Sequence, residues 1–329
     1  MREPASTCKT TLLITGASGF VGGALCRRLA AQDVFSIKAP LRSASVDLPP
    51  GVQRCSFGGL ATSSDWTSTL SGVDIVIHAA ARVHVMKEHE VDSLAEYRRI
   101  NVEGSLSLAR QAVAAGVRRF IFISSVKVCG ESSQPGQPLR ADDTPAPVDA
   151  YGISKYEAEL ALYQLAADTG LELVVIRPVL VYGPGVKANF HSMMRWVYHG
   201  VPLPFASVDN RRSLIFLDNL IDLIATCIDH PKAVNQTFLA SDGDDVSISH
   251  LLRSLGQALG RPARLVAIPN GLLRLGGRLL SRSDMTQRLM GSLQVDISKN
   301  KQMLEWTPPF TLEQGLIVTA QHFLETHRS

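Results

Sequence analysis

The chain has 329 residues, of which 45% are hydrophobic and 19% are charged. This is a globular composition, and the length exceeds what one hydrophobic core usually serves, so we expect a large domain with an appended lobe. The net charge of +3 comes from 33 basic and 30 acidic residues spread along the chain, which argues against nucleic-acid binding.

Cysteine usage and hydropathy exclude further classes of protein. The five cysteines are an odd number without a Cys-x-x-Cys pair, which fits a reducing cytosol better than a disulfide framework or a zinc site. The apolar stretch 272–280 is interrupted by arginines and glycines, so it is too short and too charged to cross a bilayer. We therefore expect a cytoplasmic protein with no metal, no signal peptide and no membrane span.

A glycine-rich segment near the start is the first functional motif. An apolar run over 12–14 predicts a buried strand, and residues 24–30 predict an amphipathic helix. Between them glycines recur at every third position, which permits a sharp turn, a close approach to a pyrophosphate and tight packing of the helix on the strand. The start of the helix offers N–H groups and a positive dipole end to phosphate. The residues assigned to cofactor binding here are Gly16, Ser18, Gly19, Phe20, Val21 and Gly22.

The second strand, expected over 34–41, bears on the choice of cofactor. In dinucleotide-binding folds an acidic residue after this strand selects NAD, whereas an arginine accommodates the 2′-phosphate of NADP. No Asp or Glu lies between Val34 and Ala44, and Arg42 follows the strand. The sequence therefore favours NADP(H) over NAD(H), with a solvated loop arginine as the alternative interpretation of Arg42.

After a short third strand over 52–57, the run of residues 72–81 predicts a strand buried on both faces. It is almost wholly apolar and includes His78, which we interpret as a buried structural histidine. Small residues at the carboxyl end of such a strand suit the close approach of a ligand. We assign three of them to the cofactor site: Ala79, Ala80 and Ala81.

The next elements bring candidate catalytic groups. A helix over about 94–115, which carries Asn101, precedes another buried-type strand over 118–125. This strand delivers the hydroxyl of Ser125 to its carboxyl end, the edge of open parallel sheets where ligands bind. A further helix is predicted from Tyr151 to about Asp168.

Tyr151 and Lys155 are four residues apart and share one face of that helix. A tyrosine is a useful acid or base near neutral pH if its pKa is lowered from about 10, and we expect the ammonium of Lys155 to lower it by Coulomb attraction. Ser125 can hold a substrate oxygen beside the phenol. This set can pass a proton to a carbonyl while a nicotinamide carries the hydride, although the pair alone also fits an ordinary helix contact.

The rest of the chain alternates less strictly between strands and helices. A strand over 173–177 stops at Pro178, and the segment 211–218 is expected to open another helix. We therefore predict an α/β fold with a Rossmann-type, doubly wound parallel sheet. The expected division is an NAD(P)-binding domain over 1–178, to which later segments cross back, and a smaller α/β substrate lobe over 179–329.

Together these motifs resemble the extended short-chain dehydrogenases/reductases of the NAD-dependent epimerase/dehydratase group, over nearly the full chain. The likeness implies that Ser125, Tyr151 and Lys155 are the catalytic set. It also implies that Asn101 steadies the active-site helix and that Pro178 lies beside the nicotinamide. The segments that carry it are residues 16–22, 74–81, 101–104, 124–125, 151–155 and 177–178.

Members of this group mostly act on nucleotide sugars, which the second lobe holds. By the resemblance, the substrate contacts in this lobe are Asn189, Phe190, Arg212 and Arg288, with the planar guanidinium of Arg212 on the diphosphate. A solvated surface charge is the alternative for either arginine. The resemblance also implies a homodimer formed through the helices near 94–115 and 151–168.

Further short segments of the sequence resemble bacterial reductases of surface-polysaccharide (O-antigen) precursor synthesis. The first expectation is therefore reduction of the 4-keto group of a UDP-4-keto-6-deoxy-N-acetylhexosamine by NAD(P)H. The alternative is a UDP-hexose or UDP-N-acetylhexosamine 4-epimerase, which would use the same residues and keep NAD bound. A dehydratase is less favoured because Val126-Lys127 replaces its usual Asp-Glu pair, and a non-catalytic NAD(P)-binding regulator would not need the Ser125, Tyr151 and Lys155 set.

Overall fold

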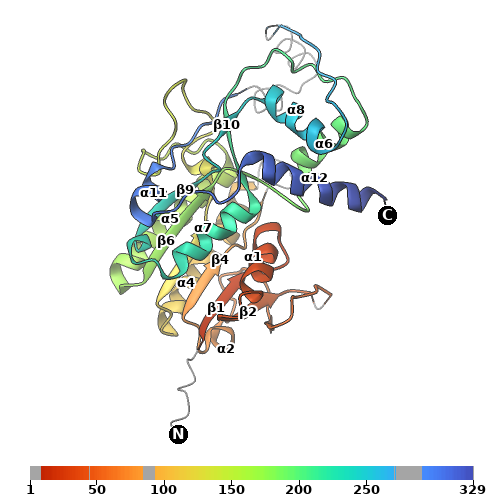
Figure 1. Cartoon of the computed structure of the whole chain (residues 1–329). Helices are drawn as coiled ribbons and strands as arrows, with labels where there is room; N and C mark the ends of the chain where they lie inside the picture. The colour runs from red at the N-terminus through yellow and green to blue at the C-terminus, as the bar shows by residue number, and fades with distance from the viewer. Residues whose placement is uncertain (1–8, 44, 84–92, 270, 272–290, 329) are drawn as a thin grey trace. The chain divides into compact units, whose positions relative to one another are not determined.

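The structure is a computed structural model that describes residues 9–43, 45–83, 93–269, 271 and 291–328. The chain divides into two compact units, and Figure 1 follows it through both by colour. Each unit combines segments that are far apart in the sequence. Unit 1 consists of the residues up to Val128, Pro147–Ile176 and Ile224–Thr237, and unit 2 of Cys129–Ala146, Arg177–Leu223 and the residues from Phe238 onward.

Seven strands form the central sheet in the order β3-β2-β1-β4-β5-β6-β9. The pairings among β1 to β6 are parallel. The strand order reverses between β1 and β4, and open α/β sheets bind ligands at the carboxyl ends of the strands at such a point. This sheet confirms the predicted Rossmann-type α/β fold. Its strands are β1 Thr10–Thr15, β2 Phe35–Leu41, β3 Val52–Ser56, β4 Ile75–His78, β5 Arg119–Ile123, β6 Glu172–Pro178 and β9 Gln236–Ala240.

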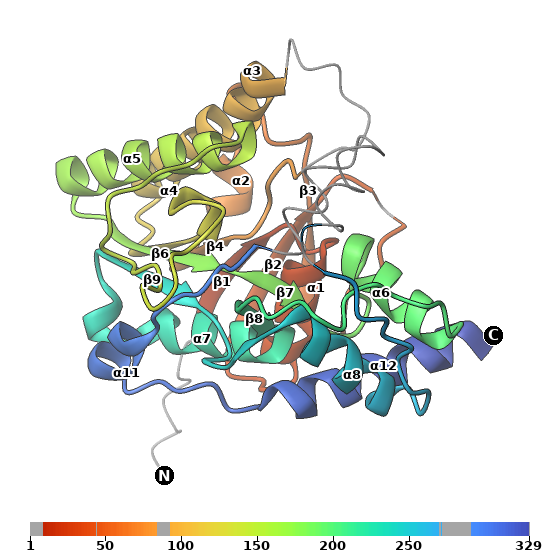
Figure 2. The same ribbon diagram turned by 90° about the horizontal axis from the view of Figure 1, so that it is seen from above.

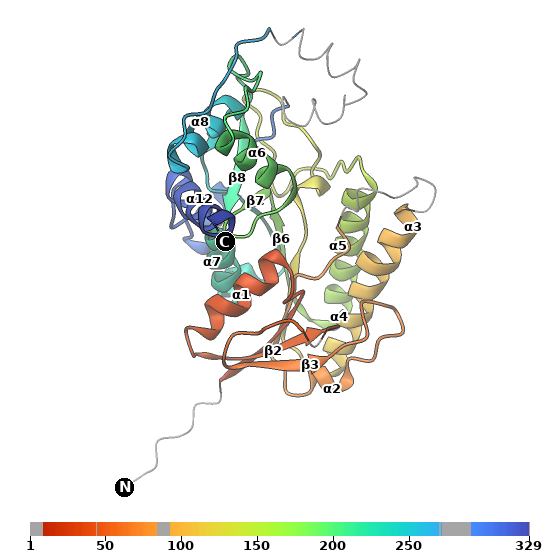
Figure 3. The same ribbon diagram turned by 90° about the vertical axis from the view of Figure 1, so that its right-hand side faces the viewer.

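The strands at the centre of the sheet are apolar because helices cover both of its faces. The side chains of Leu12, Leu13 and Ile14 in β1 are fully buried, and every residue of β4 and β5 is buried. Figures 2 and 3 show α4 and α5 on one face of the strands of unit 1 and α1 on the other. Burial on both faces explains why these strands are continuous apolar runs in the sequence.

The helices that begin in unit 1 include the two that carry the predicted functional motifs. One is α1, which follows the glycine turn, and the other is α5, which begins next to Tyr151. A long helix, α7, runs from unit 2 into unit 1. The bounds are α1 Phe20–Ala30, α2 Thr67–Leu70, the 3-10 turn η2 Val126–Val128, α5 Ala150–Thr169, α7 Leu217–Asp229 and the 3-10 turn η3 Pro231–Ala233.

The helix expected over 94–115 is not a regular α-helix. It begins as α3 (Ser93–Tyr97), widens into a π-helical segment η1 (Arg98–Gly104) and continues as α4 (Ser105–Ala114). The π-helical segment contains Asn101, whose side chain is buried. Such segments are rare and occur frequently at functional sites.

Unit 2 contains a small sheet in the order β10-β8-β7. Strand β7 pairs with β8 in parallel, and β8 pairs with β10 antiparallel. No helix in the described part of the chain is long and apolar enough to cross a membrane. The elements of unit 2 are β7 Leu180–Tyr182, α6 Ala188–Tyr198, β8 Arg212–Phe216, β10 Asp245–Val246, α8 Ile248–Ala258, α11 Ser298–Leu304 and α12 Leu312–Arg328.

The expectation that segment 211–218 opens a helix is wrong for most of its length. Residues Arg212–Phe216 form strand β8, and α7 starts at Leu217. The consecutive apolar residues Leu214, Ile215 and Phe216 are all buried because this strand lies in the middle of the small sheet. A short apolar run has no helical or strand period of its own, so its partners decide its structure.

Candidate active site

The glycine turn is so tight that side chains would not fit in it. Gly16 has a φ of +75°, and a Cβ atom there would lie 2.8 Å from the backbone nitrogen of Ala80. The N–H of Gly19 donates to the carbonyl of Gly16 at 2.8 Å, and a Cβ atom on Gly22 would overlap with the same carbonyl. The three glycines therefore let the strand, the turn and the helix pack backbone against backbone, as in a dinucleotide cradle.

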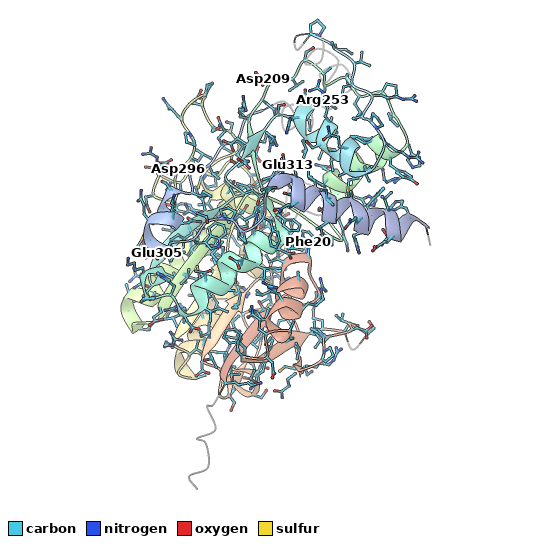
Figure 4. The ribbon with its side chains drawn as sticks, viewed as in Figure 1. Phe20, Asp209, Arg253, Asp296, Glu305 and Glu313 are labelled. Carbon is cyan, nitrogen blue, oxygen red and sulfur yellow. The ribbon has the colours of Figure 1, made fainter. Side chains whose placement is uncertain are left out.

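The first turn of α1 is suited to an anion. Gly19 is its N-cap, so no side chain of the cap satisfies the first N–H groups, and the turn contains no acidic residue. Ser18 is exposed, Val21 is half-buried, and Phe20, labelled in Figure 4, begins the helix. The leading N–H groups and the positive end of the helix dipole favour a pyrophosphate here. The glycine turn and α1 therefore fit a dinucleotide.

Strand β4 ends next to this turn, on a histidine with a structural role. His78 shares a 2.7 Å hydrogen bond with Oγ1 of Thr15 and a 2.9 Å hydrogen bond with Oγ of Ser105. Burial and the nearby charge of Lys155 lower the pKa of His78 to about 3, so its ring is neutral. His78 is thus the buried structural histidine that was expected, and its side-chain partners join the end of β1 to α4. The residues that follow it are half-buried: Ala79, Ala80 and Ala81.

Arg42 follows β2 directly, and its side chain is exposed. The carbonyl of the next residue, Ser43, accepts a 2.9 Å hydrogen bond from Nη1 of Arg54 on β3. Arg54 therefore braces the loop that carries Arg42. The guanidinium of Arg54 also adds positive charge at the end of β2, the place where dinucleotide folds meet the adenosine ribose.

Asn101 bridges two segments from its place in the π-helical segment. Its Oδ1 accepts from the backbone N–H of Arg82 at 2.8 Å, and its Nδ2 donates to Oγ of Ser154 at 3.0 Å. Oγ of Ser154 in turn donates to the carbonyl of Tyr151 at 2.8 Å. The side chain of Asn101 thereby links the residues after β4 to the first turn of α5, which fits the steadying role implied by the resemblance.

The start of α5 lies against the 3-10 turn that follows Ser125. Asp149 is the N-cap of the helix, because its Oδ1 accepts from the N–H of Gly152 at 2.7 Å. The ammonium of Lys127 forms an ion pair with the same carboxylate, and the N–H of Lys127 donates to Oγ of Ser125 at 3.3 Å. A Cβ atom on Gly152 would lie 2.9 Å from the carbonyl of Lys127. A glycine at this position thus lets the first turn of α5 approach the Ser125 loop.

Lys155 is buried at the end of β5, with 1% of its surface exposed. Its Nζ donates to the carbonyl of Ile123 at 2.8 Å and lies 4.3 Å from the centre of the Phe122 ring. Burial lowers the pKa of Lys155 to about 7, although the negative charge of Glu159 acts in the opposite direction. Because this pKa lies near neutral pH, the groups around Lys155 determine what fraction of its side chain is charged there.

Tyr151 is half-buried and lies edge-on to Tyr97, with 6.1 Å between the ring centres. We expected Lys155 to lower its pKa, and this expectation is wrong for the protein alone. Burial raises the pKa of Tyr151, and Asp149 and Tyr97 raise it further. The ammonium of Lys155 is held by the Ile123 carbonyl. The phenol of Tyr151 therefore retains its proton at neutral pH.

The remaining predicted residues lie on other elements. Pro178 is the buried last residue of β6. In unit 2, Asn189 is exposed in the first turn of α6, whereas Phe190 is buried and its ring stacks on Tyr182 at 5.4 Å. The ring of Phe190 is thus part of the core of unit 2. A ligand that binds at this residue therefore contacts its backbone and not its ring.

Arg212 begins β8, and its Nη1 donates to the carbonyl of Gly291 at 3.0 Å. Arg288 lies outside the described residues.

Two acidic residues near the site were missed in the sequence. One is the N-cap Asp149. The other is Glu159, which is 2% exposed and accepts a hydrogen bond from Oγ of Ser124. A signal for Glu159 was present, because Tyr151, Lys155 and Glu159 recur every four residues along α5 and so follow one another on the helix surface. The described residues include no group of His, Cys, Asp and Glu that could hold a metal ion.

Comparisons with known proteins agree on a family. The "NAD dependent epimerase/dehydratase family" matches residues 12–240. "UDP-glucose 4-epimerase" of Vibrio cholerae is 48% identical over 318 residues, which are 96% of each chain.

Solved structures resemble the fold at low sequence identity. "UDP-Glucose 4-Epimerase" of Thermotoga maritima, solved with UDP-glucose, has a TM-score of 0.76 at 21% identity and covers 97% of this chain and 100% of its own. "UDP-Glucuronic acid 4-epimerase" of Bacillus cereus, solved in complex with NAD, has a TM-score of 0.78 at 19% identity, covering 97% and 98%.

These relatives correct the first functional expectation. The chain was expected to reduce a UDP-4-keto-6-deoxy-N-acetylhexosamine, but the relative that matches almost its whole length at 48% identity is named a UDP-glucose 4-epimerase. The reductase expectation came from short segments that resemble bacterial reductases, and the Ser, Tyr and Lys set, which serves both reactions, does not distinguish them.

The family follows from the match over more than half of the chain and from this relative. The parallel sheet, the glycine cradle and the Tyr151 and Lys155 pair on α5 agree with it. The chain belongs to the NAD-dependent epimerase/dehydratase family and is an enzyme of the extended short-chain dehydrogenase/reductase type.

Proposed function

We propose that the chain is a UDP-hexose 4-epimerase that interconverts UDP-glucose and UDP-galactose. The observation that carries the proposal is the 48% identity, over 96% of both chains, with the UDP-glucose 4-epimerase of Vibrio cholerae. The glycine cradle supports it, because an epimerase of this kind needs a firmly bound dinucleotide that is regenerated in every turnover.

The residues of unit 1 provide the proton chemistry of such a reaction. The dinucleotide supplies a hydride acceptor and donor at carbon 4 of the sugar. Tyr151 moves the proton of the 4-hydroxyl, Ser125 holds the sugar oxygen with its hydroxyl, and Lys155 provides a positive charge one helical turn along α5. The phenol of Tyr151 is protonated in the protein alone, so in this scheme it acts as a base only where the charge of Lys155 stabilises the phenolate.

The proposed nucleotide contacts lie in unit 2. Arg212 begins β8 with a half-buried guanidinium, and a planar guanidinium suits a diphosphate. Asn189 is exposed at the start of α6 and supplies an amide for hydrogen bonding. We assign the same role to the backbone of Phe190, and to Arg288 by resemblance.

The proposed cofactor is a nicotinamide adenine dinucleotide, with Arg42 favouring the 2′-phosphate of NADP. Arg54 supports this choice because it braces the same loop and adds a second guanidinium. The nucleotide released by denaturing the purified protein identifies the cofactor by mass spectrometry. NADP as the main species supports the role of Arg42, and NAD as the main species contradicts it.

The experiment that tests the activity is a conversion assay with the purified protein and no added reductant. We expect UDP-glucose and UDP-galactose to reach the same equilibrium mixture from either side, as followed by the anomeric proton signals in NMR. UDP-N-acetylglucosamine is the second substrate to compare. Failure to convert either nucleotide sugar would contradict the proposal, and faster conversion of the acetylated sugar would move it to that substrate.

The proposed setting is a cytoplasmic homodimer that acts in the supply of nucleotide sugars. The exposed side chain of Leu160, 52% accessible on α5, is consistent with a contact between copies through this helix. Light scattering of the wild type and of Leu160→Glu tests the dimer. A dimer that Leu160→Glu converts to a monomer supports this interface, and a monomeric wild type contradicts it.

A further inference from the structure

A buried acidic residue continues the row formed by Tyr151 and Lys155 on α5. Glu159 lies one helical turn beyond Lys155, and the two side chains are 2% and 1% exposed. Charged side chains are almost never buried to this extent unless they are paired. Glu157, on the same helix, is instead half-buried and forms an ion pair with Arg98 at 2.6 Å.

Lys155 and Glu159 are both held by the end of β5. Nζ of Lys155 donates to the carbonyl of Ile123 at 2.8 Å. Oγ of the next residue, Ser124, donates to Oε1 of Glu159, and the N–H of Ser124 is fixed by the carbonyl of Ile176 at 2.7 Å. Two consecutive residues of one strand end therefore hold the ammonium and the carboxylate in place.

The surroundings of Lys155 explain why a negative charge is needed there. The nearby group on β4 is His78, which is neutral. On β5, Lys155 faces the Phe122 ring and the Ile123 carbonyl. On its own helix Lys155 follows Tyr151, whose phenol is protonated. Removing an ammonium from water without compensation strongly disfavours its charged form. Among the described residues, Glu159 is the group whose charge opposes this effect at Lys155.

We propose that Glu159 is a positioning residue of the active site, whose buried carboxylate, one helical turn from Lys155 and anchored by the next residue of the same strand end, keeps Lys155 charged at the end of β5. Lys155 can support proton transfer by Tyr151 as long as it carries its positive charge. Glu159 therefore acts through Lys155 and needs no contact with substrate. The inference rests on the proposed function for its kinetic test.

The kinetic test is the pH profile of kcat/KM for Glu159→Gln. The amide keeps the shape of the side chain and an oxygen that accepts from Ser124, but it removes the charge. We expect the alkaline limb of the profile to move to lower pH by about one to three units, the range that a close opposite charge produces. Glu157→Gln, which removes a surface carboxylate of the same helix, should leave the limb in place. A lower kcat with an unshifted limb would mean a purely structural role and would overturn the proposal.

A second measurement reads the charge of Lys155 without any sugar substrate. Lysine labelled with carbon-13 at Cε is incorporated into the protein with its bound nucleotide, and the Lys155 signal is assigned by its loss in Lys155→Met. We expect this signal to titrate at lower pH in Glu159→Gln than in the wild type and in Glu157→Gln. Equal midpoints in all three proteins would overturn the inference. An inactive wild type would contradict the proposed epimerase while leaving this titration to decide the role of Glu159.

Ser124→Ala provides a variant that keeps the carboxylate and removes its anchor. We expect a shift of the Lys155 titration in the same direction but smaller than in Glu159→Gln, since the charge remains and its position is less fixed. A shift in the opposite direction would contradict the proposed arrangement. Because Ser124→Ala is a mild substitution, this test also holds if Glu159→Gln does not fold.

Discussion

Tyr151 is the residue on which the proposed proton transfer depends. Replacement by phenylalanine removes the hydroxyl and leaves the ring that lies edge-on to Tyr97. We expect Tyr151→Phe to lower kcat by about 10²- to 10⁴-fold, the usual contribution of a positioned acid or base. The bound nucleotide and the thermal stability should be unchanged.

Tyr156→Phe is the matched control, because Tyr156 is another half-buried tyrosine of α5. It should retain the kcat of the wild type. If Tyr151→Phe were as active as Tyr156→Phe, the proton would have to come from another group. The comparison of the two variants therefore separates the role of the hydroxyl from the packing of the helix.

The pH dependence follows from Lys155. Burial lowers the pKa of this side chain to about 7, so Lys155 is charged below that pH and neutral above it. If its charge supports proton transfer, kcat/KM falls as the pH rises through about 7. A profile that stays flat well into the alkaline range would contradict this assignment.

At the scale of elements, the π-helical segment is joined to α5, the helix that carries Tyr151, by the side chain of Asn101. Asn101→Ala breaks the hydrogen bonds that join Arg82 and Ser154, and it leaves buried polar groups without their partner. We expect a loss of about 1–3 kcal/mol in the free energy of unfolding and a lower kcat, as measured by urea unfolding and the conversion assay. Ser154→Ala removes one of these hydrogen bonds and should have a smaller effect. Equal activity of Asn101→Ala and the wild type would contradict the steadying role.

The carboxyl end of α7 is held by a buried arginine of β5. Nη1 of Arg119 donates to the carbonyls of Cys227 and Ile228 at 2.8 and 2.7 Å, and its Nε donates to Glu172 at 2.7 Å. A cation is favourable at the end of a helix, where carbonyls have no partner in the helix itself. Because Arg119 is 2% exposed, its loss leaves several buried acceptors unsatisfied.

We therefore expect Arg119→Leu to reduce the free energy of unfolding by about 3 kcal/mol. Arg118→Leu is the control, since the side chain of Arg118 is 45% exposed and its contacts with Glu172 and Asp229 are longer, at 3.3 and 3.5 Å. Its loss should cost at most about 1 kcal/mol. Urea unfolding of both variants measures the difference, and similar losses would contradict the structural role of Arg119.

For the molecule as a whole, the structural features that could be predicted from the sequence are those that depend on local patterns of residues. The apolar run of β1, the spacing of Gly16, Gly19 and Gly22 and the four-residue spacing on α5 are visible without a structure, and they define the sheet, the cradle and one helix face. These features are predictable because neighbouring residues determine them.

The remainder depends on contacts between distant residues. Strand β8 lies where the sequence predicts a helix, because its pairing with β7 and β10 is not visible in the run Leu214–Phe216. The π-helical segment contains Asn101, whose partners are Arg82 and Ser154. The raised pKa of Tyr151 comes from burial and from Asp149 and Tyr97. The spacing of the tyrosine and the lysine in the sequence reveals none of these three causes.

The reaction itself was the least predictable property. A reductase and an epimerase place the same Ser125, Tyr151 and Lys155 beside a nicotinamide, and they differ in whether hydride returns to the same sugar. That difference depends on how the keto-sugar turns and how firmly the cofactor is held, which are properties of the folded molecule. The relative from Vibrio cholerae, and not the motifs, overturned the reductase expectation.

The measurement that tests the central claim most directly follows the hydrogen on carbon 4 of the sugar. Purified protein without added nucleotide is incubated with UDP-glucose that carries deuterium at carbon 4, and the product is analysed by NMR and mass spectrometry. The account predicts UDP-galactose that retains the deuterium at carbon 4, because hydride leaves and returns within one bound sugar. Absence of UDP-galactose, or UDP-galactose that has lost the deuterium, would contradict it.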